Sequence, residues 1–119
     1  MGMYTQLVIN TKIRDDISNE IINILAFLFN GEELNEDIIP EHKFFKCQRW
    51  ELIGRCGYIL SATSQYKGGY LFSKSELKNY NNEIELFIDW LKPYICEYSD
   101  EFIGYWLYEE YDKPELIFK

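Results

Sequence analysis

The residues of this chain that could carry catalytic or metal chemistry are one histidine, three cysteines and twenty carboxylates. A Ser-His-Asp or Cys-His arrangement would have to use His42, which follows Pro40 and Glu41 in a polar segment typical of a surface loop. The sequence contains neither of the glycine-rich phosphate-binding motifs G-x-x-x-x-G-K-[ST] and G-x-G-x-x-G. Its many carboxylates form no distinct acid/base pair. We therefore expect a protein that is not an enzyme and has no cofactor.

The three cysteines, Cys47, Cys56 and Cys96, are an odd number with wide spacings and no C-x-x-C pair. Neither a disulfide framework nor a zinc site has that pattern, and His42 adds no metal-ligand spacing. We expect free thiols, as in a reducing compartment, and no metal.

Basic and aromatic residues alternate in the middle of the chain, and together they could recognise a small anion. Stacking on aromatic rings beside cationic groups is how many proteins hold nucleotides. The alternative is ordinary cross-strand packing of aromatic rings, with cationic stems lying over them. As a ligand-binding hypothesis, the candidate residues are Arg49, Trp50, Arg55, Tyr58 and Tyr70.

Charge divides the chain into an acidic N-terminal arm, a basic middle and an acidic C-terminal arm. Residues 1–42 carry a net −6, residues 43–78 a net +5 and residues 79–119 a net −7, within a total of −8. The parts could neutralise one another, or the surface could be bipolar and steer a charged partner. Net acidity argues against direct nucleic-acid binding, because phosphate contacts need a positive footprint. Carboxylates that we expect to contact a basic protein are Glu97, Asp100, Glu101, Glu109, Glu110 and Asp112.

Hydrophobic periodicity predicts the elements that position these groups in the N-terminal half. Alternation predicts a strand over 4–14, and apolar residues at helical spacing predict a helix over 16–30, capped by Asp15 or Asp16 and stopped at Asn30-Gly31. Residues 31–43 form an acidic segment whose oxygens do not match a calcium-loop register, so we expect a solvated loop.

The remaining sequence predicts a strand meander, a second helix and a final strand pair. Strands are expected over 44–53, 58–66 and 70–73, with glycine-containing turns between them. Asn82 begins a helix, and Glu85 is placed as in a capping box. That helix ends near Lys92 because Pro93 follows. A strand over 102–110 and a short one at 116–118 complete the chain.

These elements predict an α+β fold. The order β-α-β-β-β-α-β, with or without one further strand, gives an antiparallel sheet of five to six strands with two helices packed on one face. A chain of 119 residues fits a single domain spanning 1–119, in which Met1-Gly2 looks like a cloning remnant ahead of Met3. No apolar run approaches the ~20 residues that a membrane span needs, so we expect no membrane association and a cytoplasmic protein.

Part of the C-terminal third, roughly residues 78–117, resembles small uncharacterised phage and prophage proteins. The resemblance implies a phage or mobile-element setting in a bacterial host cell, and it carries no activity and no functional residues. The residues that carry it are Lys78-Asn79-Tyr80, Glu83, the run from Phe87 to Tyr94, Ile103-Gly104-Tyr105, Glu109-Glu110 and the run from Pro114 to Ile117.

The function that these observations favour is a small acidic intracellular interaction protein. A phage-encoded accessory or counter-defence inhibitor would present its carboxylates to the surface of a basic, nucleic-acid-binding protein. One alternative is a small anionic ligand or nucleotide binder that uses the aromatic and basic meander. Another is a toxin-immunity protein, which would share the composition, and a homo-oligomer is compatible with all of these hypotheses.

Overall fold

The computed structural model describes residues 4–57, 59–61, 63–96 and 100–119. Tyr58 and Glu97, two of the predicted site residues, lie outside these ranges. The elements follow in the order β1 (Thr5–Lys12), α1 (Asn19–Asn30), the 3-10 turns η1 (Glu36–Ile38), η2 (Lys43–Lys46) and η3 (Trp50–Leu52), β2 (Arg55–Cys56), β3 (Ile59–Leu60), β4 (Gln65–Lys67), β5 (Tyr70–Leu77), α2 (Glu83–Leu91), η4 (Lys92–Tyr94), β6 (Phe102–Tyr108) and β7 (Glu115–Phe118).

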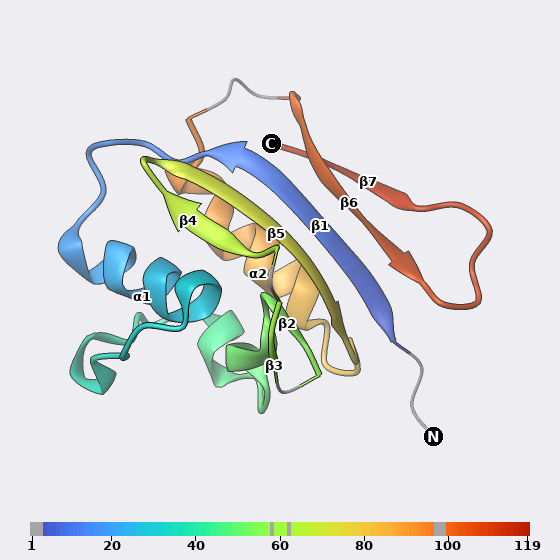
Figure 1. The fold of residues 1–119 in the computed structure, drawn as a ribbon, viewed down its shortest axis with the longest axis horizontal. Coiled ribbons are helices and arrows are strands. Elements are labelled where there is room, and N and C mark those ends of the chain that lie inside the picture. The colour runs from blue at the N-terminus through green and yellow to red at the C-terminus, as the bar shows by residue number, and fades with distance from the viewer. Residues whose placement is uncertain (1–3, 58, 62, 97–99) are drawn as a thin grey trace.

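The strands form one seven-stranded sheet, which confirms the predicted α+β class (Figure 1). The order is β3-β2-β5-β1-β6-β7, and β4 pairs with β5 beside β2. All pairs are antiparallel except β2 with β5, which is parallel, so the sheet is mixed rather than wholly antiparallel. The sheet has more strands than the predicted five to six because the segment 55–67 folds into three short strands.

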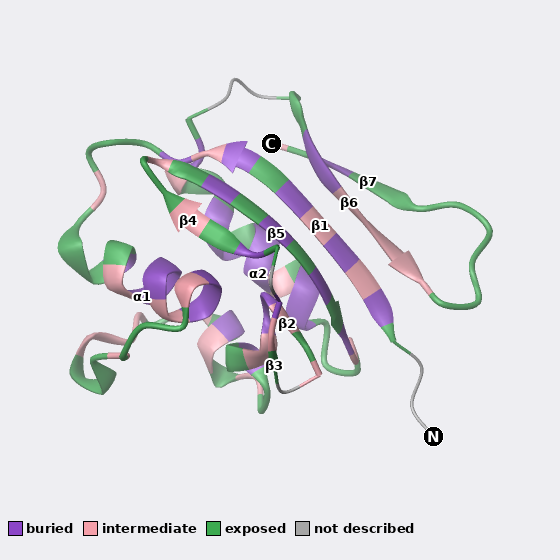
Figure 2. Ribbon diagram, in the orientation of Figure 1, coloured by how far each residue is buried: buried purple, intermediate pink, exposed green. Residues whose placement is uncertain are grey.

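Strand β1 lies at the centre of the sheet, and its alternation positions the core. Thr5, Leu7, Ile9 and Thr11 are buried, whereas the residues between them are partly or fully exposed (Figure 2). The same alternation marks β5, in which Leu71, Ser73, Ser75 and Leu77 are buried. Both helices contribute their apolar stripes to the core beneath this face of the sheet.

The segment 43–53 is not a strand, contrary to the prediction; it forms the 3-10 turns η2 and η3. His42 Nδ1 accepts a hydrogen bond from the Phe44 N–H at 3.1 Å and so caps the first turn. Phe44 and Trp50 are buried, and Phe45 packs edge-on against Trp50 with ring centroids 4.9 Å apart. Local capping and aromatic burial therefore override an alternation that was read as a strand.

The helix predicted over 16–30 begins later, at Asn19, and its cap is Ser18 rather than Asp15 or Asp16. Ser18 Oγ accepts from the Ile21 N–H, whereas Asp16 is held in an ion pair by Arg14 at 2.6 Å. The helix ends as predicted, with Gly31 in the left-handed conformation that closes a helix.

Helix α2 begins after Asn82 and gives way at Lys92 to the turn η4, which contains Pro93, as predicted. The expected capping box is absent, because the Asn82 side chain makes no capping hydrogen bond. Asn79 replaces it: its Oδ1 accepts from the Ile84 N–H at 2.9 Å, and its Nδ2 donates to Glu85 at 2.7 Å.

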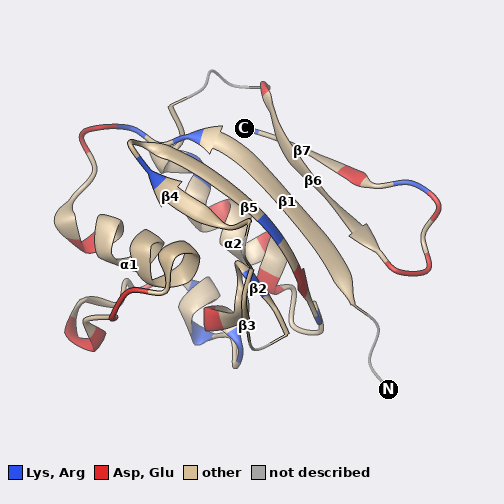
Figure 3. Ribbon diagram, in the orientation of Figure 1, with Lys and Arg blue, Asp and Glu red and all other residues tan. Residues whose placement is uncertain are grey.

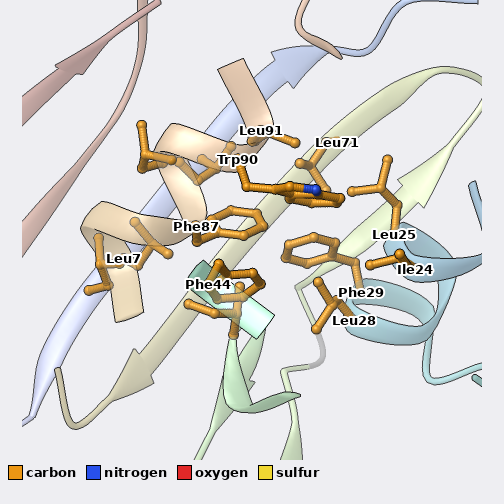
Figure 4. Packing of buried hydrophobic residues seen from close by; sticks show 14 of the residues in the cluster. Leu7, Ile24, Leu25, Leu28, Phe29, Phe44, Leu71, Phe87, Trp90 and Leu91 are labelled. Atoms are coloured by element: carbon orange, nitrogen blue, oxygen red, sulfur yellow. The ribbon is translucent and has the colours of Figure 1, made fainter. Parts of the chain in front are cut away.

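An aromatic cluster joins the two helices to the 3-10 turns (Figure 4). The Phe44 ring lies 5.3 Å from Phe87 and 6.2 Å from Trp90 between centroids, and Phe29 lies 5.8 Å from Phe87. Trp90 is 3% exposed and so belongs to the core. Its Nε1–H has no hydrogen-bond partner among the described residues.

The central strand β1 is paired with β6, and the two backbones approach closely at Gly104, which is paired with Ile9. A Cβ atom at Gly104 would overlap the carbonyl oxygen of Val8 and lie 3.1 Å from the Ile9 Cα. This close approach is available only to glycine.

Candidate protein-interaction site

The turn that joins β6 to β7 brings three of the predicted carboxylates together with tyrosines. Glu109, Glu110 and Asp112 are all exposed in this turn, at the tip of the hairpin (Figure 3). The turn is fixed locally, since the Tyr111 N–H donates to the Tyr108 carbonyl at 2.9 Å. The two rings pack edge to face with centroids 5.2 Å apart. We call these five residues, together with Tyr80, the hairpin-tip cluster.

A hollow of about 200 Å³ lies beside the hairpin-tip cluster. Three tyrosines and one tryptophan give its walls an aromatic character, and two polar side chains complete them. Its lining residues are Thr5, Asn79, Tyr80, Trp106, Tyr108 and Tyr111. Tyr80 is 65% exposed and Tyr111 54% exposed, so their rings are accessible to a partner.

The lining of the hollow is uncharged, and three carboxylates lie in the turn beside it. Glu109, Glu110 and Asp112 form no ion pair with the described residues. The pKa of the Tyr108 phenol is raised, chiefly by partial loss of hydration. Electrostatic repulsion from the nearby Glu110, Tyr80 and Glu109 makes smaller contributions in the same direction. Uncompensated carboxylates around accessible aromatic rings favour a cation, because both groups attract positive charge.

The two other predicted carboxylates that the structure describes lie elsewhere. Asp100 and Glu101 precede β6, at the end of the hairpin opposite the tip, and the seven residues of β6 separate the two groups. Asp100 is tied there by its N–H, which donates to the Lys119 carbonyl at 2.8 Å. The five of these carboxylates that the structure describes therefore do not form one patch: Glu109, Glu110 and Asp112 are brought together at the tip, and Asp100 and Glu101 lie apart from them.

The four residues of the ligand-binding hypothesis that the structure describes lie in different parts of the molecule. Trp50 is buried in the aromatic cluster, and Arg55 lies 5.9 Å from the Phe27 ring centroid. Tyr70 is 60% exposed on the opposite face of the sheet, with Lys12 Nζ 5.9 Å from its ring. Arg49 is exposed beside a separate hollow that Lys78 and Glu83 also line.

A second acidic hollow, which the sequence does not predict, lies beside the acidic loop that is expected to be merely solvated. This hollow is wider, about 1170 Å³, and has the aromatic rings of Phe27 and Trp50 among its walls. Its carboxylates are Glu33, Glu36, Asp37 and Glu51. Phe27 lies near the end of the helix predicted over 16–30, and the acidic segment 31–43 follows it directly. This closeness in sequence is the signal that could have indicated the hollow. Missed likewise were Tyr80, Tyr108 and Tyr111, which stand beside the predicted carboxylates in sequence or space.

In the described part of the chain, no group of three or more His, Cys, Asp or Glu side chains is placed to hold a metal ion. None of the described helices combines the length and apolar composition that crossing a membrane requires.

The three cysteines are unpaired, and they differ in exposure. Cys56 and Cys96 are exposed, whereas partial burial, with a smaller contribution from Glu83, raises the pKa of the Cys47 thiol. A raised pKa leaves less thiolate at a given pH, and the thiolate is the reacting species. We expect iodoacetamide to modify Cys47 several-fold more slowly than Cys56 and Cys96, as measured by mass spectrometry of timed samples.

Glu83→Gln provides the control for this prediction, because it removes the charge while retaining an oxygen that can accept from the Asn81 N–H, 2.6 Å from Glu83 Oε1. Cys47 alone should then react faster. Equal rates at all three cysteines in the unaltered protein would contradict the prediction.

No protein-family model, curated protein or solved structure matches this chain.

Proposed function

We propose that this protein is a non-catalytic interaction protein that binds a basic protein through the hairpin-tip cluster. The observation that supports this function best is the hollow lined by Tyr80, Tyr108 and Tyr111, with the carboxylates of Glu109 and Glu110 next to it. An arginine or lysine side chain of a partner fits such a site. Its charge would be balanced by the carboxylates, and its stem and head would lie against the rings.

The position of the cluster suits a protein partner. It lies on a turn at the edge of the molecule, where a second macromolecule can approach without rearranging the core (Figure 3). Charged residues at the rim of an interface mainly speed association, while aromatic residues supply much of the binding free energy. The hairpin tip offers both kinds of residue together.

We further propose a cytoplasmic setting in a bacterial host, in keeping with the resemblance of residues 78–117 to small phage proteins. An inhibitor of a nucleic-acid-binding protein would use such a surface to occupy the basic groups that otherwise contact phosphate. A toxin-immunity protein would use it in the same way against a basic toxin.

A titration of the protein with a hexa-arginine peptide tests this proposal. NMR of the tyrosine rings locates the binding site, and surface plasmon resonance measures the affinity and the association rate. We expect shifts confined to Tyr80, Tyr108 and Tyr111, and binding that weakens as salt is added, because exposed charges are screened beyond about 8–10 Å. Replacing Glu109, Glu110 and Asp112 by lysine should weaken binding at least about tenfold, mostly through slower association.

The second acidic hollow supplies a control with the same change in net charge. Replacing Glu33, Glu36 and Asp37 by lysine should weaken binding far less if the hairpin tip is the site. Equal losses in the two variants would mean that only net charge matters, and the proposed site would be abandoned. Capture of partners from a bacterial lysate by the unaltered protein, but not by the hairpin-tip variant, would then identify the natural partner.

A further inference from the structure

The outer edge of strand β7 is an open pairing site. Among the strands of the described residues, β7 is the last in the sheet order, and β6 is the one strand that pairs with it. At four residues it is longer than β3 and β4, the short strands on the other side of the sheet. Main-chain groups at such an edge are available to another strand.

The direction of these main-chain groups follows from Lys119. Its N–H donates to the Glu101 carbonyl at 2.9 Å, and its carbonyl accepts from the Asp100 N–H at 2.8 Å, so both groups face the β6 side. Main-chain groups alternate in direction along a strand. Those of Glu115 and Ile117 therefore face β6 as well, whereas Leu116 and Phe118 direct their N–H and C=O groups outward.

The sequence of this edge is complementary to itself. When two copies of β7 run antiparallel with Ile117 opposite Ile117, Leu116 faces Phe118 and Glu115 faces Lys119. Leu116 and Phe118 are the two residues that face outward, so each such pair can exchange both main-chain hydrogen bonds. Two oppositely charged pairs flank them, and cross-strand pairs of this kind are stabilising.

Neighbouring registers fit less well. Centring the pair on Leu116 would set Phe118 opposite Pro114, which has no N–H to donate. The side chains agree with the Ile117-centred register too. Leu116 is 55% exposed and Phe118 44% exposed, and Phe118 packs on Phe102 with ring centroids 5.9 Å apart. Pairing would place Leu116 of the second copy against this ring pair.

We propose that two copies of this chain associate through β7, in a two-fold antiparallel pair centred on Ile117, which joins their sheets into one. The partner is a second copy because this edge is complementary to the same edge running in the opposite direction. The charged residues, the apolar residues and the outward main-chain groups of one copy all meet suitable partners on the other. Lys119 Nζ donates to the Ile95 carbonyl at 2.6 Å, and its remaining N–H groups are available to Glu115 of the second copy. A contact made by one short strand from each copy buries less area than a standard protein interface, so the dimer is weak.

Sedimentation equilibrium up to millimolar concentration tests the proposal on the unaltered protein. We expect a monomer when dilute and a dimer when concentrated. NMR hydrogen exchange should show that the amides of Leu116 and Phe118 become protected as concentration rises, whereas the Ile117 amide is protected throughout. A monomer at every concentration overturns the proposal, and so does a dimer in which the Leu116 and Phe118 amides stay unprotected.

Charge exchange tests the register. Glu115→Lys alone sets lysine opposite lysine, and Lys119→Glu alone sets glutamate opposite glutamate, so each variant should dimerise about tenfold more weakly. Mixing the two variants restores opposite charges at both ends and should restore dimerisation. Circular dichroism of each variant checks that the monomer is folded. Dimerisation that is unchanged in the single variants, or not regained on mixing, overturns the Ile117-centred pair.

Discussion

Gly104→Ala is expected to destabilise the fold by about 3 kcal/mol or more, at the upper end of what overpacking costs. The added methyl group would overlap the carbonyl oxygen of Val8, a main-chain atom of the central strand that cannot move without parting β1 from β6. Because native domains have only about 5–15 kcal/mol of stability in total, this loss removes a large share of it. Urea unfolding followed by tryptophan fluorescence measures the change.

Gly68→Ala is the matched control for this prediction. Gly68 has φ of +61°, and a Cβ atom there would meet nothing within 4 Å. Its replacement should cost only the strain of a left-handed conformation, about 1–2 kcal/mol. If Gly104→Ala costs no more than Gly68→Ala, the close approach of β1 to β6 is not the reason that glycine occupies position 104.

Trp90→Ala is expected to cost about 3–5 kcal/mol, the range for removing a large buried aromatic side chain. The indole lies among the rings of Phe44, Phe45, Phe87 and Tyr94, with centroid distances from 5.1 to 6.2 Å. Removing it would leave a cavity between α2 and the 3-10 turns. Guanidinium unfolding, with near-ultraviolet circular dichroism as a probe of ring packing, measures the loss.

Trp90→Phe separates the ring from its polar group. The phenylalanine ring retains much of the packing, and the change also removes an N–H that is buried without a partner. Such a buried group costs about 1–3 kcal/mol, so its removal offsets part of the lost contact, and we expect a net cost of about 1 kcal/mol. A loss below 1 kcal/mol for Trp90→Ala, or equal losses for both variants, would contradict this account of the core.

The fold class and both helices could be predicted because their determinants are local. The apolar stripe of α1, its stop at Gly31 and the turn at Pro93 are all encoded by residues close together in the chain. Segment 43–53 could not be placed in this way. Its conformation depends on where Phe44 and Trp50 find a pocket, and that pocket is supplied by α1 and α2.

The candidate site was predicted only in part, for a related reason. The carboxylates at 109–112 are visible as a charge run, but the hollow beside them also needs Tyr80 and Thr5. These two residues are distant in sequence, and the pairing of the strands brings them to the hollow. By contrast, the separation of Asp100 and Glu101 from the carboxylates at 109–112 follows from a strand that the sequence does predict, over 102–110, and that the structure has as β6.

The central position of β1 also affects how the chain is made. Thr5 pairs with Tyr108 and Ile9 with Gly104, so β1 leaves the ribosome about a hundred residues before its neighbour β6 exists. Contacts so distant in sequence slow folding, and until they form, an apolar strand is open to chaperones and to other chains. Truncated nascent chains that stop before β6 should therefore be captured by ribosome-associated chaperones more readily than chains that extend past β7.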